Sequence, residues 1–399
     1  MSDSFVLHQP IFDVGNAVWG YSLFSHDSIS ETIDQDTAAA RILSATFLGP
    51  SRDWEQAMYL VTFDVQSLEK EIPLSIPNQH LVVMIGSDCQ PDALTLTNLD
   101  NVKKSGATIA VSGEMLKKQW RDALPLIDIV VVDISISSPL DWVQFISENQ
   151  DKRFLASQIN DHESWFLAQQ FGFTLFQGQF IEKPQLAETA DLAPSTLALL
   201  NLCLLTQSPE SSIEDISGAV GKDVNILYKV INGANILAKT KSKPISDIKQ
   251  AVVYMGLDAL RRLVSLLAMT NLNHESALHI QTLSIQRAIF LSTLPFVHRS
   301  YNASEAYIVG AFSLLDVLLS TQMSKAINEL NLSQEVRSAL IDRKGVYGEL
   351  LSLCQSLEQA NFDDVSARCS RLKIQEKNLL ICHQDAREAA GELTKALRV

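Results

Sequence analysis

The chain is poor in cysteine and in basic residues, and each shortage excludes a class of protein. Its five cysteines are an odd number without a Cys-x-x-Cys pair, so neither a disulfide framework nor a zinc site is indicated. They are Cys89, Cys203, Cys354, Cys369 and Cys382. Lys and Arg number 32 against 46 Asp and Glu, and the formal charge of -14 disfavours binding to nucleic acid or to anionic membranes.

The chain also lacks a long apolar run. The longest ones, such as residues 263–269 and 306–315, are too short or too interrupted to span a bilayer. The first residues contain neither the basic region nor the apolar stretch of a signal peptide. From these absences we expect a soluble protein of the cytoplasm.

What is present fits two globular domains. With 399 residues, 46% of them hydrophobic and 20% charged, the chain exceeds the length of one compact core. Up to residue 185, short β-branched or apolar runs alternate with amphipathic stretches, which is the rhythm of a (β/α) barrel. The expected strands are 5–8, 18–24, 59–63, 81–85, 107–111, 127–133, 154–158 and 174–176. Residues 1–185 are therefore predicted to form a small, closed, eight-stranded TIM-like barrel of the α/β class.

The rest of the chain predicts an all-α domain. Residues 186–194 are rich in Pro, Ala and acidic residues without periodicity, and we interpret them as a linker. In residues 195–399 helical patterns follow one another, with Ser212 and Ser246 as expected N-caps. The broad apolar face over 307–319 predicts a buried helix.

The negative charge is concentrated in the barrel half. Up to Gln185 there are 11 basic and 24 acidic residues, against 21 and 22 after it. Even so, carboxylates are scarce at the C-terminal strand ends, where a barrel enzyme needs them. Asp64 and Asp133 lie at such ends, and a lone Asp there is more often a turn or cap residue than a metal ligand.

Motifs at both ends of the barrel half resemble those of an EAL domain. They are residues 9–13 (QPIFD), 20–24 (GYSLF) and 176–180 (FQGQF), the last followed by Lys183-Pro184. EAL domains fold as barrels and hydrolyse the bacterial messenger cyclic di-GMP with two divalent metals. The resemblance spans residues 5–184 and implies a barrel related to cyclic di-GMP signalling.

Most residues that this resemblance implies for catalysis are replaced. The glutamate of the EAL motif falls on Ser22, the phosphate-holding arginine on His26, a metal-binding asparagine on Thr62 or Phe63, and a further glutamate within the apolar residues 83–85. The paired aspartates fall on Ser112 and Gly113, the essential lysine on Val131 beside a retained Asp133, and the late catalytic glutamate on Ser157. Gln9 and Gln177 match the family's pattern.

These replacements predict a protein that is not an enzyme. Ser, Gly and Val cannot replace ionised carboxylates as ligands of divalent metals. We therefore expect no catalytic residues, no metal ligands and no cofactor. Binding of cyclic di-GMP is also disfavoured, because His26 stands in place of the arginine and the barrel half is acidic.

The helical half resembles an HDOD domain, a relative of HD hydrolases that has lost their metal ligands. The matching segments are 212–216 (SIEDI), 229–234 (KVINGA), 248–252 (IKQAV) and 255–261 (MGLDALR), and 310–316 (GAFSLLD) resembles an extension found when HDOD follows EAL. The histidines of this half, His274, His279, His298 and His383, are not followed by Asp, and the adjacent His26-Asp27 pair lies in the barrel half. The tandem resemblance implies a bacterial signalling adaptor linked to motility, surface behaviour or stress.

Residues 214–232 could instead be interpreted as a DNA-binding helix-turn-helix. The acidic residues of this segment outnumber Lys222 and Lys229, so a recognition helix would approach phosphates without a positive excess. Packing inside the helical domain is the favoured interpretation.

Three functional hypotheses result. The favoured one is a non-enzymatic signalling scaffold, because both halves resemble enzyme folds without their ligands. The alternatives are a cyclic di-GMP receptor that binds through Gln9, Gln177 and backbone donors, and a residual phosphodiesterase. We expect protein partners to bind the nearly neutral helical half, whose alternative role is to stabilise the barrel, and a homodimer is compatible with the sequence.

Overall fold

The structure, a computed structural model, describes most of the chain. The described residues are 5–26, 35–47, 57–76, 79–185, 194–222, 224–237, 245–270, 278–296, 298–299, 301–328 and 330–397. The chain divides into two compact units, Met1–Lys183 with Leu357–Phe362, and Pro184–Ser356 with Asp363–Val399. The expected linker lies outside the described residues except for Pro194, which begins the first helix of the second unit.

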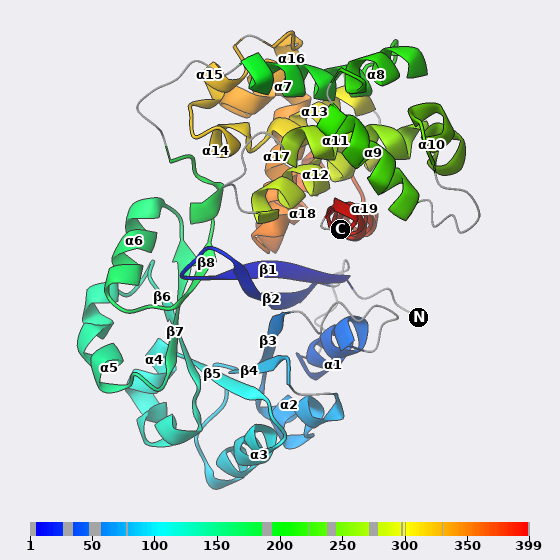
Figure 1. Cartoon of the computed structure of the whole chain (residues 1–399). Helices are drawn as coiled ribbons and strands as arrows, with labels where there is room; N and C mark the ends of the chain where they lie inside the picture. Colours follow the sequence, from blue (N-terminus) through cyan, green and yellow to red (C-terminus); the bar gives the residue numbers. More distant parts are fainter. Residues whose placement is uncertain are drawn as a thin grey trace. The chain divides into compact units, whose positions relative to one another are not determined.

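Eight strands close into a barrel, which confirms the predicted fold class (Figure 1). They are β1 (Phe5–Asp13), β2 (Val18–His26), β3 (Met58–Phe63), β4 (Leu81–Ile85), β5 (Thr108–Ser112), β6 (Ile129–Asp133), β7 (Arg153–Ile159) and β8 (Leu175–Gly178). Strand β1 is antiparallel to both β2 and β8, whereas the other neighbouring pairs are parallel. The C-terminal ends of β2 to β8 therefore meet at one end of the barrel, the mouth, beside the N-terminal end of β1.

A tight hairpin joins β1 to β2 at the end of the barrel opposite the mouth. The carboxylate of Asp13 accepts hydrogen bonds from the backbone N–H groups of Gly15 (2.9 Å) and Ala17 (3.0 Å). Between them, Asn16 takes a left-handed φ of 60°, which Asn tolerates better than most residues. This turn reverses the chain without a helix, so the barrel begins with an antiparallel pair.

Apolar side chains fill the centre of the barrel. The layer consists of Ile11, Leu60, Val82, Ala110, Ile129, Leu155 and Leu175, from every strand except β2. At this level β2 has Gly20, which is paired with Ile11 and Met58. A Cβ at Gly20 would lie 2.5 Å from the Met58 carbonyl oxygen, so the approach of β2 to β3 needs a glycine there.

Helices surround the barrel, and many of them are short, as expected for a barrel of this size. The α-helices are α1 (Gln35–Phe47), α2 (Val65–Glu69), α3 (Ala93–Lys104), α4 (Gly113–Met115), α5 (Val143–Glu148) and α6 (His162–Gln170). The 3₁₀ and π segments are η2 (Ile72–Ser75), η3 (Leu116–Trp120), η4 (Arg121–Leu126), η5 (Pro139–Trp142) and η6 (Phe180–Glu182).

The described part of the second unit is helical, as predicted. Its first helices are α7 (Pro194–Gln207), α8 (Ile213–Val220), α9 (Val224–Leu237), α10 (Ile248–Met255), α11 (Leu257–Thr270), α12 (Leu278–Thr293) and α13 (Ala303–Phe312). They are followed by α14 (Leu315–Leu318), α15 (Met323–Ala326), α16 (Gln334–Asp342), α17 (Gly345–Glu358), α18 (Phe362–Leu372) and α19 (Glu376–Leu397). Among the described helices, none combines the length and apolar character that a membrane crossing requires.

Ser212 caps α8 as predicted, with a reciprocal capping box to Asp215. At α10, however, the carboxylate of Asp247 accepts from the backbone N–H of Gln250 (2.8 Å), while the Ser246 hydroxyl donates to the Gln250 side chain (3.2 Å). The carboxylate at 247 is thus the capping group, one residue later than expected.

The helix expected over 307–319 is divided between α13 and α14. Ser313 ends α13, and its hydroxyl donates to the Gly310 carbonyl oxygen (2.7 Å). Leu314 then has φ -122° and ψ 22°, outside the helical region. The apolar pattern is continuous across this break because residues 306–315, on both sides of it, are buried.

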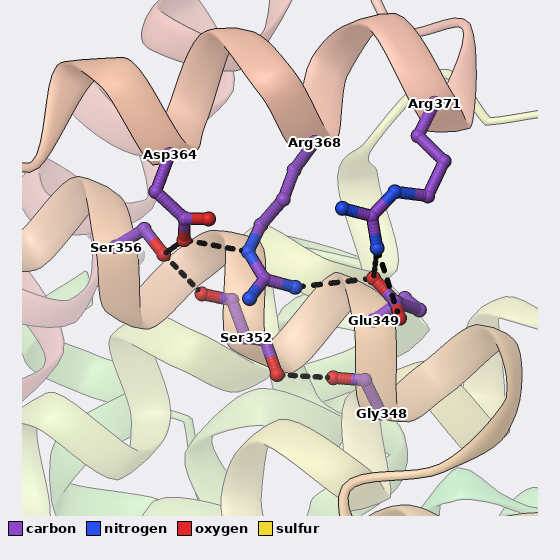
Figure 2. Close-up of polar contacts among 7 residues, drawn as sticks. All are labelled: Gly348, Glu349, Ser352, Ser356, Asp364, Arg368 and Arg371. Carbon is purple, nitrogen blue, oxygen red and sulfur yellow. Dashed lines mark hydrogen bonds and ion pairs between the residues drawn. The ribbon is translucent and has the colours of Figure 1, made fainter.

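A network of charged and hydroxyl side chains joins α17 to α18 (Figure 2). Arg368 donates from Nε to Asp364 (2.7 Å) on its own helix and from a terminal nitrogen to Glu349 (3.1 Å) on α17. Arg371 pairs with the same Glu349 carboxylate at 3.2 Å. Ser356 also donates to Asp364, and hydrogen bonds from Arg368 and then Ser356 lower the pKa of the Asp364 carboxyl. Because one cation joins two carboxylates, the network should contribute more than an isolated surface pair.

Removal of Arg368 should loosen this pair of helices. In an Arg368→Met variant, Asp364 and Glu349 lose a shared cation, and we expect the unfolding midpoint to fall by about 2–4 °C, which corresponds to about 1 kcal/mol. Lys344→Met is the matched control, because Lys344 is 76% exposed and lies 3.9 Å from Asp342. Differential scanning calorimetry measures both shifts. Equal shifts in the two variants would contradict a stabilising role for the network.

Candidate functional site

Strand alternation brings a ring of side chains to the mouth of the barrel. Successive side chains point to opposite faces, so the residue two positions closer to the mouth than each member of the apolar layer again faces inward. These residues, the mouth ring, are Gln9, Ser22, Thr62, Met84, Ser112, Val131, Ser157 and Gln177. Met84 and Val131 pack against the apolar layer, which agrees with their inward direction.

The mouth ring contains most of the positions to which the EAL resemblance assigns catalytic residues. It also resolves two alignments that the sequence leaves open. Thr62 is exposed in the ring, whereas Phe63 is fully buried on the opposite face of β3. Within 83–85, the inward residue is Met84. The implied asparagine and glutamate are therefore replaced by a hydroxyl and a thioether.

The two glutamines of the ring contact one another. The Gln177 side-chain nitrogen donates to the Gln9 side-chain oxygen over 3.3 Å. Gln9 is also paired in register with Ser22, which is buried. Next to Gln177, Gly178 has φ 149°, and a Cβ there would lie 2.1 Å from the Ile159 carbonyl oxygen. The three strands β1, β2 and β8 thus bring the EAL-like motifs together at one side of the mouth.

Two carboxylates lie near the ring, and both accept hydrogen bonds from their own loops. Asp64 is buried and caps α2 by accepting from the Ser67 backbone N–H (2.9 Å). Asp133 Oδ1 accepts from the backbone N–H (2.8 Å) and the hydroxyl (2.6 Å) of Ser135. These are the cap and turn roles expected of a lone Asp at a strand end. Asp133 lies two residues beyond Val131 on β6, so it belongs to the inward face.

Position 113 has no room for a side chain. A Cβ at Gly113 would lie 2.5 Å from two atoms of the Trp142 ring and 3.3 Å from Val132 Cγ2. The Trp142 ring is buried, its N–H donates to the Ser137 hydroxyl (2.9 Å), and the Lys117 ammonium lies 4.0 Å from its centroid. The aspartate that the EAL resemblance implies at 113 would therefore have to displace a packed indole.

The described mouth residues do not fit the two divalent metals that the EAL resemblance implies. The ring offers amides, hydroxyls and apolar groups with Asp133 beside it, whereas hard divalent cations are held by several oxygens that include carboxylates. Over the described part of the chain, no cluster of three or more His, Cys, Asp or Glu could hold a metal. The side chain of His26 and residue Asp27 lie outside the described residues.

One histidine of the helical unit is buried as a neutral group. His383 on α19 is 7% exposed, and its Nε2 lies 3.1 Å from the side-chain nitrogen of Gln286 on α12. Its ring meets Phe290 edge to face, with 5.8 Å between the centroids. Burial lowers the pKa of His383 to about 4. This histidine therefore serves the packing of α19 on α12.

Among the described residues, the histidines of this unit belong to no cluster that could hold a metal. His298 is exposed and stacks on Phe296, with 6.0 Å between the ring centroids. His279 lies in α12, and His274 lies outside the described residues. The interpretation of these residues as single histidines without a metal stays a prediction.

Residues 192–341 match the family model of the HDOD domain. The helical unit therefore contains an HDOD domain, as the resemblance predicts, and helices α17 to α19 lie beyond the match. The chain thus combines a closed eight-stranded barrel with a helical HDOD region.

Two curated proteins are similar to nearly the whole chain. The cyclic di-GMP phosphodiesterase CdgJ of Vibrio cholerae is 28% identical over 383 residues, which cover 93% of this chain and 89% of the relative. The uncharacterized protein YuxH of Bacillus subtilis is 24% identical over 409 residues, which cover 98% of this chain and 99% of the relative. Both similarities extend across the barrel and the helical half.

A solved structure also resembles part of the chain. The Bacillus subtilis protein YkuI, with an EAL domain, in complex with cyclic di-GMP and calcium, is 17% identical and covers 63% of this chain and 72% of its own, with a TM-score of 0.37. This score is too low to support a conclusion, so the barrel assignment rests on the strand order.

The prediction that this chain is not an enzyme is wrong. That prediction rests on the replaced residues at Ser22, Ser112, Gly113, Val131 and Ser157. It is overturned by CdgJ, a relative over 93% of the chain that is named a cyclic di-GMP phosphodiesterase. The comparisons likewise give no support to a non-enzymatic scaffold. Loss of a family's ligands shows which residues are missing, and it does not establish what the remaining ones do.

The buried neutral His383 should make the helical unit sensitive to acid. Its pKa is about 4 in the folded chain against 6.5 when unperturbed, so below pH 6.5 the unfolded chain binds a proton that the folded chain does not. Stability should therefore fall as the pH drops from 6.5 towards 4. A His383→Gln variant should show a shallower loss over this range in urea unfolding, while exposed His298→Gln should behave like the unaltered chain. The same pH slope in all three proteins would contradict the role of His383.

Proposed function

We propose that this chain acts on cyclic di-GMP as a phosphodiesterase of bacterial signalling, with an EAL-type barrel as the acting domain. The observation that carries the proposal is the similarity to CdgJ, which is named for this activity and matches 93% of the chain. Because the match includes both halves, it supports the same pairing of a barrel with a helical domain. The EAL-like motifs support the type of barrel, although Ser22 replaces the glutamate of the EAL motif.

The mouth is the part of the barrel that suits this activity. In enzymes with (β/α) barrels, substrates bind at the C-terminal ends of the strands. Gln9 and Gln177, which match the EAL pattern, contact each other at that end. The hydroxyl residues Thr62, Ser112 and the buried Ser22 belong to the same mouth ring.

Hydrolysis of cyclic di-GMP requires a water oxygen to attack one phosphorus and one P–O ester bond to break. The sugar oxygen that leaves takes up a proton, and the ring opens to a linear dinucleotide. Attack is faster when a carboxylate takes the proton of the water. Asp133 lies on the inward face of β6 with one oxygen held by Ser135, and no described residue engages its other oxygen. We infer that Asp133 is this general base and that Ser135 positions it.

The rate should be modest. One positioned general base contributes about 10²–10⁴-fold, whereas a two-metal site would also stabilise the attacking and leaving oxygens. The described mouth supplies a base and neutral hydrogen-bond donors. We therefore expect slow turnover that depends on Asp133.

An Asp133→Asn variant tests this role. The full chain is incubated with cyclic di-GMP and Mg²⁺ or Mn²⁺, and the linear dinucleotide is quantified by chromatography. We expect Asp133→Asn to lower the rate by about 100-fold, since the amide cannot take a proton. Asp141→Asn, which removes the same charge from an exposed position in η5, is the matched control and should leave the rate unchanged.

Two outcomes would contradict the proposal in different ways. If neither metal gives any product, the proposal that the chain is a phosphodiesterase is wrong. If Asp133→Asn forms product at the rate of the unaltered chain, the chain is a phosphodiesterase but Asp133 is not its general base. A circular dichroism spectrum of each variant shows whether the barrel is still folded.

Protein partners of the helical unit stay a prediction. Tyr228 on α9 is 70% exposed and Tyr254 on α10 is 51% exposed, and aromatic side chains are enriched in interfaces. These two tyrosines are the residues at which we propose that a partner of this unit makes contact. In a pull-down with the full chain, Tyr228→Ala should lose a partner that exposed Leu94→Ala in the barrel retains.

A further inference from the structure

A short segment of the C-terminal half belongs to the barrel unit. It is Leu357–Phe362, whereas the residues on either side of it belong to the second unit. The segment, here called the α17–α18 turn, contains the end of α17, the residues after it and the first residue of α18. Leu357 is fully buried, so packing anchors the start of this turn.

The α17–α18 turn is closed at its base and tight at its tip. Ser356 on α17 donates to Asp364 on α18, and these two residues flank the turn (Figure 2). At the tip, the Ala360 backbone N–H donates to the Leu357 carbonyl oxygen (3.0 Å), and Ala360 has a left-handed φ of 54°. Because a residue with a Cβ is strained in that region, substitution of Ala360 can either increase or relieve the strain of the turn.

The α17–α18 turn contacts one residue of the mouth ring. The side-chain nitrogen of Gln9 donates to the Glu358 carbonyl oxygen over 3.2 Å. The side-chain oxygen of the same glutamine accepts from the Gln177 side chain over 3.3 Å. These two contacts engage both the donor end and the acceptor end of the Gln9 amide. Gln9 is therefore held on one side by β8 and on the other by the turn.

We propose that this contact is autoinhibitory: the α17–α18 turn holds Gln9 and slows the barrel until the turn is displaced. The inference rests on the proposed function, because it concerns the regulation of the same phosphodiesterase. Gln9 lies at the end of the barrel at which substrates of (β/α) barrels bind. A side chain that the protein itself engages has to give up that hydrogen bond before it can serve a substrate.

Helices α17 and α18 are joined closely enough to move as one body. Arg368 on α18 donates to Asp364 on its own helix (2.7 Å) and to Glu349 on α17 (3.1 Å). Both helices lie beyond the residues that match the HDOD model, 192–341. Because the turn connects the two helices, a displacement of the pair also displaces the turn. A partner protein that shifts this helix pair therefore releases Gln9 and raises the rate.

Two substitutions of Ala360 test the contact in opposite directions. Ala360→Val places a β-branched side chain at a left-handed φ and should loosen the turn, whereas Ala360→Gly removes the strain. We expect Ala360→Val to raise the turnover of cyclic di-GMP by the full chain about three- to tenfold, the effect of one hydrogen bond. Ala360→Gly should leave the rate unchanged or lower it. Lys373→Val is the matched control, because Lys373 has a φ of 57° just beyond the other end of α18 and should keep the unaltered rate.

Hydrogen–deuterium exchange of the peptide that covers β1 (Phe5–Asp13) reports on the contact without turnover. We expect faster exchange in Ala360→Val than in the unaltered chain or in Lys373→Val. Equal exchange in all three proteins would overturn the inference that the turn holds β1. Faster exchange with an unchanged or lower rate would overturn the autoinhibitory role. No product from any of the proteins would overturn the proposed function, and the exchange would still decide whether the turn holds β1.

Discussion

Closure of the barrel is the constraint on which the rest of this structure depends. Once eight strands are joined in a fixed register, alternation determines which side chain each strand directs into the mouth. The closure itself depends on two close backbone approaches, at Gly20 beside Met58 and at Gly178 beside Ile159. Both glycines belong to the EAL-like motifs. The motif residues are therefore partly structural: they close the barrel, and their neighbours Gln177 and Ser22 face the mouth as a result.

Much of the fold could be predicted from the sequence because the barrel strands are short, apolar and separated by turn residues. The sequence does not predict which side of each strand faces inward, because residues 62–63 and 83–85 are apolar or mixed in either register. The pairing of β3 with β4 aligns Thr62 with Met84, and the packing of Met84 against the apolar layer shows that this pair faces inward. The helix break at Ser313 was equally hidden, because burial on both sides keeps the apolar pattern continuous.

The candidate site was harder to predict than the fold. Asp64 and Asp133 look alike in sequence, as single carboxylates at strand ends. In the structure they differ: Asp64 is buried as a helix cap, whereas Asp133 uses one oxygen for its own loop and lies on the inward face of β6. The prediction of an inactive protein rested on the missing ligands, and the similarity to the phosphodiesterase CdgJ contradicts it. A base and neutral donors can still promote hydrolysis, more slowly than metals do.

The replaced positions are coupled through packing, which limits how this mouth could regain a metal site. Ser112→Asp alone would add a carboxylate to the ring, since residue 112 faces inward. A carboxylate at 113 requires Trp142 to move, and the indole N–H of Trp142 is bonded to Ser137 in the loop that follows Asp133. Moving the indole would thus disturb the turn that holds the retained carboxylate. Position 113 is in contact with Trp142, and Trp142 is bonded to the loop that follows Asp133, so a change of chemistry at this mouth has to alter these residues together.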